Sequence, residues 1–145
     1  MGTTYETDVV AWANEQAALL RSGQLSSIDI ENIAEEILDV GKSEQRELES
    51  RMAVLLAHLL KWQFQPERRS SSWEETIRVQ RNRIERRLRK TPSLKASLSD
   101  PDWCADAWDD AVDDASKETG ITRLTFPQTC PWSIENILSE GWLPS

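Results

Sequence analysis

Cysteine and histidine are scarce in this chain, and their scarcity argues against several kinds of site. The 145 residues include two cysteines and one histidine. Cys104 and Cys130 lie in different segments with no further Cys or His at metal-ligand spacing, so neither a zinc site nor a redox pair is indicated. We expect two free, largely buried thiols. No pattern in the chain marks a catalytic residue, a metal site or a cofactor.

Long apolar runs and strand-like alternation are also missing. No stretch approaches the roughly 20 apolar residues that cross a membrane, and the first residues, MGTTYETDVV, lack the basic and then apolar layout of a signal peptide. We therefore expect a cytoplasmic protein with no membrane partner. Five Gly and six Pro leave room for long helices, while seven Trp and a hydrophobic content of 39% are typical of a folded chain.

Glycine and proline divide the first two thirds of the chain into three helical segments. Residues 5–22 place apolar side chains at helical spacing and end before a glycine. A second segment runs from about 29 to 64; Gly41 costs it about 1 kcal/mol relative to Ala, so a break there is the alternative. A third segment can be capped by Ser71 or Ser72 and ends at Pro92.

Two further helices and an irregular strap are predicted in the last third. Asp100 can cap a helix that Gly120 closes, and Ser133 can cap a short one that runs to about residue 140. Between them, TFPQTCPW offers Phe126 and Trp132 as apolar anchors for a strap over the helices. We predict an all-α, single-domain bundle of about five helices over 1–145, with one long central helix (about 29–64) and a Pro-punctuated C-terminal strap.

One apolar stripe runs along the predicted long helix, and we expect it to form the core. Its spacings of three, four and eleven residues keep one face of the helix. The stripe contains Ile30, Ile33, Ile37, Val40, Leu48, Met52, Leu55, Leu59 and Trp62.

The order of the motifs resembles a known family. Three stretches carry the resemblance: YETDVVAWANEQAALLRSG, then IDIENIAEEILDVGKSEQRELESRMAVLLAHLLKWQFQPERRSSSW, then TFPQTCPWSIENIL. Together they resemble the bacterial domain-of-unknown-function family numbered 29. The resemblance covers nearly the whole chain, and HLLKWQFQPERR and TFPQTCPW are its most specific parts. It implies a small all-helical, soluble protein and brings no activity, cofactor, substrate class or catalytic residue with it.

Charge is segregated along the chain, with a basic island at 66–90. That range has a net charge of +5, between −6 for 1–65 and −7 for 91–145. A basic island is the pattern expected of a nucleic-acid surface. Partners at i,i+4 can compensate much of the charge, and a net charge of −8 repels phosphate, so nucleic-acid binding is possible but not favoured. The candidate anion or partner surface is Arg68, Arg69, Arg78, Arg81, Arg86 and Arg89.

The predicted helix at 100–118 carries an acidic face. Like charges at this spacing repel by about 0.2–0.5 kcal/mol per pair. An acidic face that is simply solvated is the plain interpretation, and a cation beside the carboxylates would relieve the repulsion. The simplest source of that cation is the arginine helix of the same chain or of a second copy. The alternative is a bound metal ion, since hard cations take oxygen ligands. The candidate acidic surface is Asp102, Asp106, Asp109 and Asp113.

The only histidine belongs to a candidate polar network on the long helix. Polar groups near a core need partners, since each unsatisfied one costs about 1–3 kcal/mol. The candidate members are Glu35, Glu36, Glu44, Arg51 and His58. The simplest interpretation is that His58 is hydrogen-bonded within the fold and has a structural role only. The alternative is an enzyme or metal site centred on His58 and the helix carboxylates.

Three hypotheses about function follow from these patterns. The leading one is a non-enzymatic protein-interaction module that binds a protein partner and associates with a second copy of itself. The alternatives are nucleic-acid binding through the arginine-rich helix at 73–90 and an enzyme or metal-site protein centred on His58.

Overall fold

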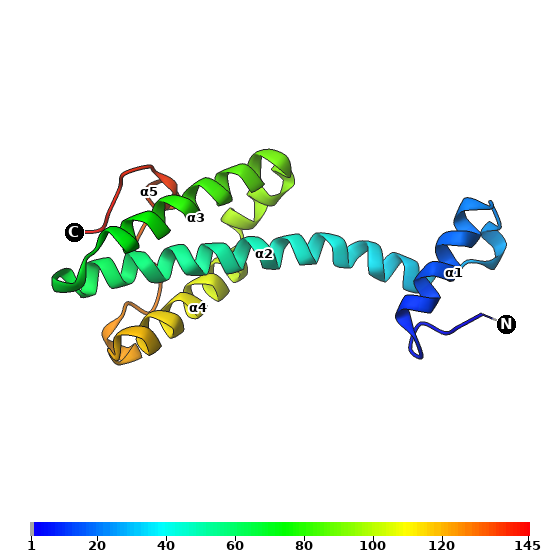
Figure 1. The fold of residues 1–145 in the computed structure, drawn as a ribbon, viewed down its shortest axis with the longest axis horizontal. Helices are drawn as coiled ribbons and strands as arrows, with labels where there is room; N and C mark the ends of the chain where they lie inside the picture. Colours follow the sequence, from blue (N-terminus) through cyan, green and yellow to red (C-terminus); the bar gives the residue numbers. More distant parts are fainter. Residues whose placement is uncertain (1) are drawn as a thin grey trace. The chain divides into compact units, whose positions relative to one another are not determined.

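The computed structural model describes residues 2–145, and within that range every regular element is helical (Figure 1). The α-helices are α1 (Val9–Arg21), α2 (Ile30–Phe64), α3 (Ser71–Lys90), α4 (Pro101–Thr119) and α5 (Ile134–Leu138). The 3-10 helices are η1 (Leu25–Ser27), η2 (Pro66–Arg68), η3 (Pro92–Ser99) and η4 (Arg123–Thr125). The predicted all-α class is confirmed.

Side-chain caps set most of the helix boundaries. Asp8 accepts from Ala11 N–H, so α1 begins at Val9 and not at residue 5. The predicted cap of α3 is wrong by one residue: Ser70 accepts from Trp73 N–H, and Ser71 is already helical. Asp100 caps α4 and Gly120 closes it with a φ of 76°, as predicted. α5 ends at Leu138, slightly earlier than expected.

The long helix predicted at about 29–64 is confirmed at Ile30–Phe64 and runs without a break through Gly41. The chain divides into two compact units, Met1–Ser43 (the N-terminal unit) and Glu44–Ser145 (the C-terminal unit). A single cooperative unfolding transition of the whole chain would support the prediction of one domain.

The C-terminal unit holds the hydrophobic core. α3 and α4 flank the C-terminal half of α2 in Figure 1. Leu48, Leu55 and Leu59 of α2 are fully buried, and Ile84 of α3 packs with them. On α4 the buried face is rich in alanine, which allows close approach of the helix to its neighbours.

The C-terminal strap covers this core, as predicted. Phe126 is buried and meets Phe64 edge to face at 5.0 Å between ring centroids. Trp132 lies between Trp108, at 5.5 Å, and Trp142, at 5.9 Å. Such aromatic pairs contribute about 0.5–1.5 kcal/mol each beyond the area they bury, so the anchors named from the sequence hold the strap.

Candidate interaction surfaces

Arg81 is a structural residue and not part of an exposed basic surface, contrary to the prediction. Only 7% of its surface is exposed. Its Nε donates to the Ile137 carbonyl at 2.8 Å, and its Nη2 donates to the Trp142 carbonyl at 2.6 Å. The reason lies in helix geometry, because at 100° per residue Arg81 falls within about 60° of the buried Ile77 and Ile84. Burial lowers the pKa of its guanidinium.

Two more of the candidate arginines, Arg69 and Arg78, are exposed but bonded to other residues of the chain. Arg69 donates from Nε to the Trp62 carbonyl at 2.7 Å, with its Cζ 5.0 Å from the centre of that indole, so it covers the end of α2. Arg78 pairs with Glu75, three residues before it. It does not pair with Glu74, the partner that an i,i+4 spacing predicts. Arg68, Arg86 and Arg89 are exposed.

A basic hollow lies beside the C-terminal half of α3. It has a volume of about 400 Å³. Its lining is Glu44, Arg51, Arg83, Arg86, Arg87, Lys90 and Thr91. The four basic residues that α3 contributes to this lining have the spacing i, i+3, i+4 and i+7 and therefore share one face of the helix. The surface predicted from the sequence did not contain Arg83, Arg87 or Lys90, although their spacing already places them on one face with Arg86.

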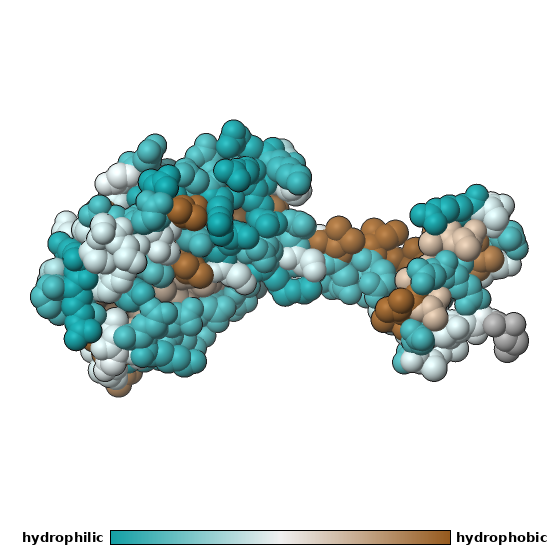
Figure 2. Space-filling model, viewed as in Figure 1, coloured by the Kyte–Doolittle hydropathy of each residue, from teal (hydrophilic) through white to brown (hydrophobic). Residues whose placement is uncertain are grey.

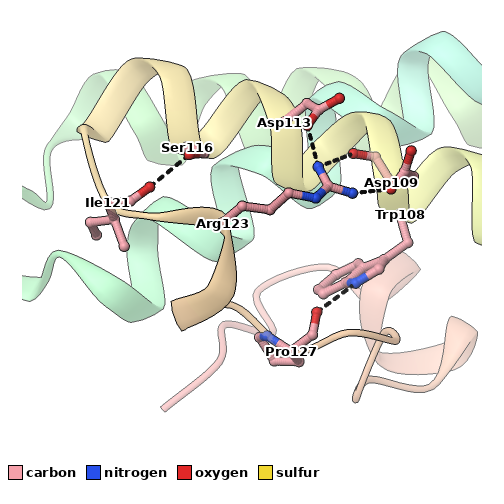
Figure 3. Close-up of polar contacts among 7 residues, drawn as sticks. All are labelled: Trp108, Asp109, Asp113, Ser116, Ile121, Arg123 and Pro127. Carbon is pink, nitrogen blue, oxygen red and sulfur yellow. Dashed lines mark hydrogen bonds and ion pairs between the residues drawn. The ribbon is translucent and has the colours of Figure 1, made fainter.

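Two residues of the candidate acidic surface, Asp109 and Asp113, pair with a cation that does not belong to the arginine helix. Arg123, at the start of η4, reaches back along α4 and pairs with the carboxylates of Asp109 and Asp113 (Figure 3). The turn that returns the chain is fixed by Ser116, whose hydroxyl donates to the Ile121 carbonyl at 2.7 Å. The expectation that α3 of the same chain neutralises this face is wrong.

A second carboxylate contact occurs where α4 faces α2. Glu49 of α2 is partly buried near Asp110 and Asp106. Its pKa is raised by burial first, then by a hydrogen bond with Asp110, and then by the charges of Asp110 and Asp106. Burial also raises the pKa of Asp114. These acidic side chains are therefore held in unfavourable surroundings at neutral pH.

His58 makes a local bond to the helix backbone. Its Nδ1 lies 2.8 Å from the Val54 carbonyl, which places the proton on that nitrogen. Burial lowers the pKa of the ring and favours its neutral form. Within residues 2–145, no group of three or more His, Cys, Asp or Glu side chains is placed to hold a metal ion.

The other candidate network residues divide into separate groups. Arg87 joins Glu44, at 2.6 Å, to Glu47, at 3.6 Å, and Glu47 pairs with Arg51 at 2.9 Å. Glu36 accepts from the Tyr5 hydroxyl within the N-terminal unit. Glu35 is exposed.

A group of hydrogen bonds around Asp29 links α1 to the start of α2 in the N-terminal unit. Asp29 accepts from Trp12 Nε1 at 2.9 Å and from Asn32 Nδ2 at 2.8 Å, and its own N–H donates to Gln16 at 2.7 Å. The bond to Asn32 is the main cause of the lowered pKa of Asp29. The bond to Glu36 raises the pKa of Tyr5 to about 12. Trp12 and Gln16 are the buried side chains of α1.

Apolar side chains of the N-terminal unit are exposed, contrary to the prediction that they belong to the core. Figure 2 shows brown patches over α1 and over the N-terminal part of α2. Ile30, Ile37 and Val40 each expose about two thirds of their surface, at 66%, 65% and 67%. The other exposed apolar side chains of this unit are Val9, Val10, Leu20, Leu25 and Leu38.

The sequence did contain a signal for this exposure. Between Val40 and Leu48 the apolar stripe is interrupted by Gly41 and by polar residues at 42–47. Carboxylates also border the stripe before that interruption, at Glu31, Glu35 and Glu36. At 100° per residue the apolar arc of 30–41 spans about 160° and has acidic residues on both edges.

The comparisons with known proteins identify the family. The family described as a domain of unknown function, DUF29, matches residues 4–143, and the chain belongs to it. No curated protein and no solved structure matches the chain. None of the helices in residues 2–145 is long and apolar enough to cross a membrane.

Proposed function

We propose that the protein is an interaction module whose N-terminal unit binds a cationic amphipathic helix of a partner protein. The exposed apolar arc of α2 carries this proposal. A soluble domain rarely leaves a large contiguous apolar surface in water, and helices commonly recognise one another by apolar residues at i, i+3 and i+7. Ile30, Ile33, Ile37 and Val40 have this spacing.

The charge of the unit favours a basic partner. Residues 1–43 contain eight acidic and two basic residues, a net charge of −6. Two copies that met through this face would bring two such charges together, whereas Lys or Arg on a partner helix would pair with the bordering carboxylates. Self-association through this surface is therefore the competing hypothesis, and it differs from the proposal in a measurable way.

Two designed helical peptides with one apolar stripe and opposite charge test this proposal. Both carry the same Leu and Ile residues, flanked by Lys in one peptide and by Glu in the other. We expect the Lys peptide to bind the full chain and the Glu peptide to bind at least about tenfold more weakly. Ile37→Gln should weaken the Lys peptide. Leu124→Gln is the matched control, since Leu124 is 92% exposed but lies in the C-terminal unit.

Light scattering on the protein alone distinguishes the competing hypothesis. A dimer that Ile37→Gln converts to a monomer would show that a second copy covers the apolar arc, and it would overturn the proposal of a cationic partner. Equal affinity for the two peptides would overturn it as well, because the carboxylates would then have no part in recognition.

A further inference from the structure

We propose that the basic hollow of the C-terminal unit binds a compact oligophosphate. Five cationic side chains line it: Arg51, Arg83, Arg86, Arg87 and Lys90. Two of them have carboxylate partners, because Arg87 pairs with Glu44 and Glu47, and Arg51 pairs with Glu47. Arg83, Arg86 and Lys90 form no ion pair within residues 2–145. The lining therefore keeps an excess of positive charge in a unit that is acidic overall, with 17 acidic and 15 basic residues.

Crowding of like charges makes the hollow receptive to an anion. On α3, Arg83 and Arg87 are an i,i+4 pair, as are Arg86 and Lys90, and such pairs repel. An anion between them would remove this repulsion and accept hydrogen bonds from the guanidinium groups, which match phosphate oxygens in geometry. The paired Arg51 and Arg87 are held in place by Glu47 and can donate with little loss of conformational freedom.

The size of the hollow and the negative electrostatic field of the whole protein favour a small ligand over a long nucleic acid. The basic stripe on α3 covers seven residue steps, a length of about 10 Å, which suits two or three linked phosphates. A hollow of about 400 Å³ accommodates such an anion. A long nucleic acid would extend beyond the stripe into the field of a protein with a net charge of −8. The proposed ligand class is therefore an inorganic oligophosphate or the triphosphate group of a nucleotide.

Calorimetric titration of the full chain with inorganic tripolyphosphate at about 50 mM salt tests the site. We expect the double variant Arg83→Gln and Arg86→Gln to lose at least about tenfold in affinity, the effect of losing one charge-assisted hydrogen bond. Arg89→Gln is the matched control, because Arg89 is exposed on the same helix and does not line the hollow. Its affinity should stay within about twofold of the wild-type value. Tripolyphosphate should also raise the Tm of the wild type and the control, but not that of the double variant.

Three results would overturn the proposal. One is no binding up to about 1 mM tripolyphosphate. Another is an equal loss in Arg89→Gln and in the double variant, which would indicate a diffuse field and no site. The last is tighter binding of a single-stranded RNA of about 20 nucleotides, weakened by Arg89→Gln, which would assign the stripe to nucleic acid. Binding of adenosine triphosphate, compared with tripolyphosphate, then separates the two sources of the same phosphate chemistry.

Discussion

Gly41 and Gly120 differ in backbone conformation but not in the space around them. A Cβ atom added at either position meets nothing within 4 Å. Gly41 lies inside α2 with helical geometry, whereas Gly120 ends α4 in the left-handed region at a φ of 76°. Substitution at Gly41 therefore tests the effect of conformational freedom on stability, whereas substitution at Gly120 tests the effect of backbone strain.

Alanine at these two glycines should have opposite effects on stability. Gly41→Ala should raise the free energy of unfolding by about 0.5–1 kcal/mol, because alanine loses less conformational freedom in a helix. Gly120→Ala should lower it by about 1–2 kcal/mol, because alanine is strained in the left-handed region. Thermal unfolding of both variants checks this. A destabilised Gly41→Ala would mean that α2 needs a flexible point at that residue.

His58 should make stability depend on pH near the usual pKa of histidine. Burial lowers its pKa in the folded protein below the usual value of about 6.5. The unfolded chain then binds more protons, so the free energy of unfolding falls as pH falls below about 6.5. His58→Gln should flatten this dependence between pH 5.5 and 7.5, a window set by about one unit on each side of the reference pKa. Urea unfolding across the window, with NMR titration of the single histidine, measures both quantities.

At the level of elements, Arg81 connects α3 to the end of the chain. Arg81→Met replaces the guanidinium side chain with an apolar one of similar length and leaves the carbonyls of Ile137 and Trp142 without this donor. We expect a loss of about 1–3 kcal/mol in the free energy of unfolding and faster proteolysis of residues 134–145. Arg89→Met, on the exposed face, should change stability by less than about 0.5 kcal/mol. Equal proteolysis of the two variants would contradict a fastening role for Arg81.

The helices could be predicted from the sequence much better than the partners of their charged residues. Asp100, Gly120 and Ser133 act within one turn of their own position, so local pattern was enough to place them. The pairing of Arg123 with Asp109 depends on how the chain turns after α4, which no local pattern contains. The burial of Arg81 could have been predicted, because its position on the helical wheel already places it among buried residues.

For the whole molecule, the two units should differ in local stability. In α1 only Trp12 and Gln16 are buried, whereas the C-terminal unit holds a continuous core. Helices without apolar packing are marginal in water. We expect backbone amides of α1 and of residues 34–43 to exchange with deuterium at lower free energy than those of residues 48–64. Binding of the Lys peptide should slow exchange in the N-terminal unit. Uniform protection along α2 would instead support one cooperative domain over 1–145.

The hydrogen bonds of Arg81 also bear on how the chain is made. The donor and its acceptor on Ile137 are separated by 56 positions, so at 5–20 residues per second a ribosome takes about 3–11 s to proceed from one to the other. During that interval α2 and α3 can form and meet, but the guanidinium must remain hydrated. These bonds can therefore form only after residues 137–142 have been made, and a chain truncated before α5 would leave the Arg81 guanidinium without both of its carbonyl acceptors.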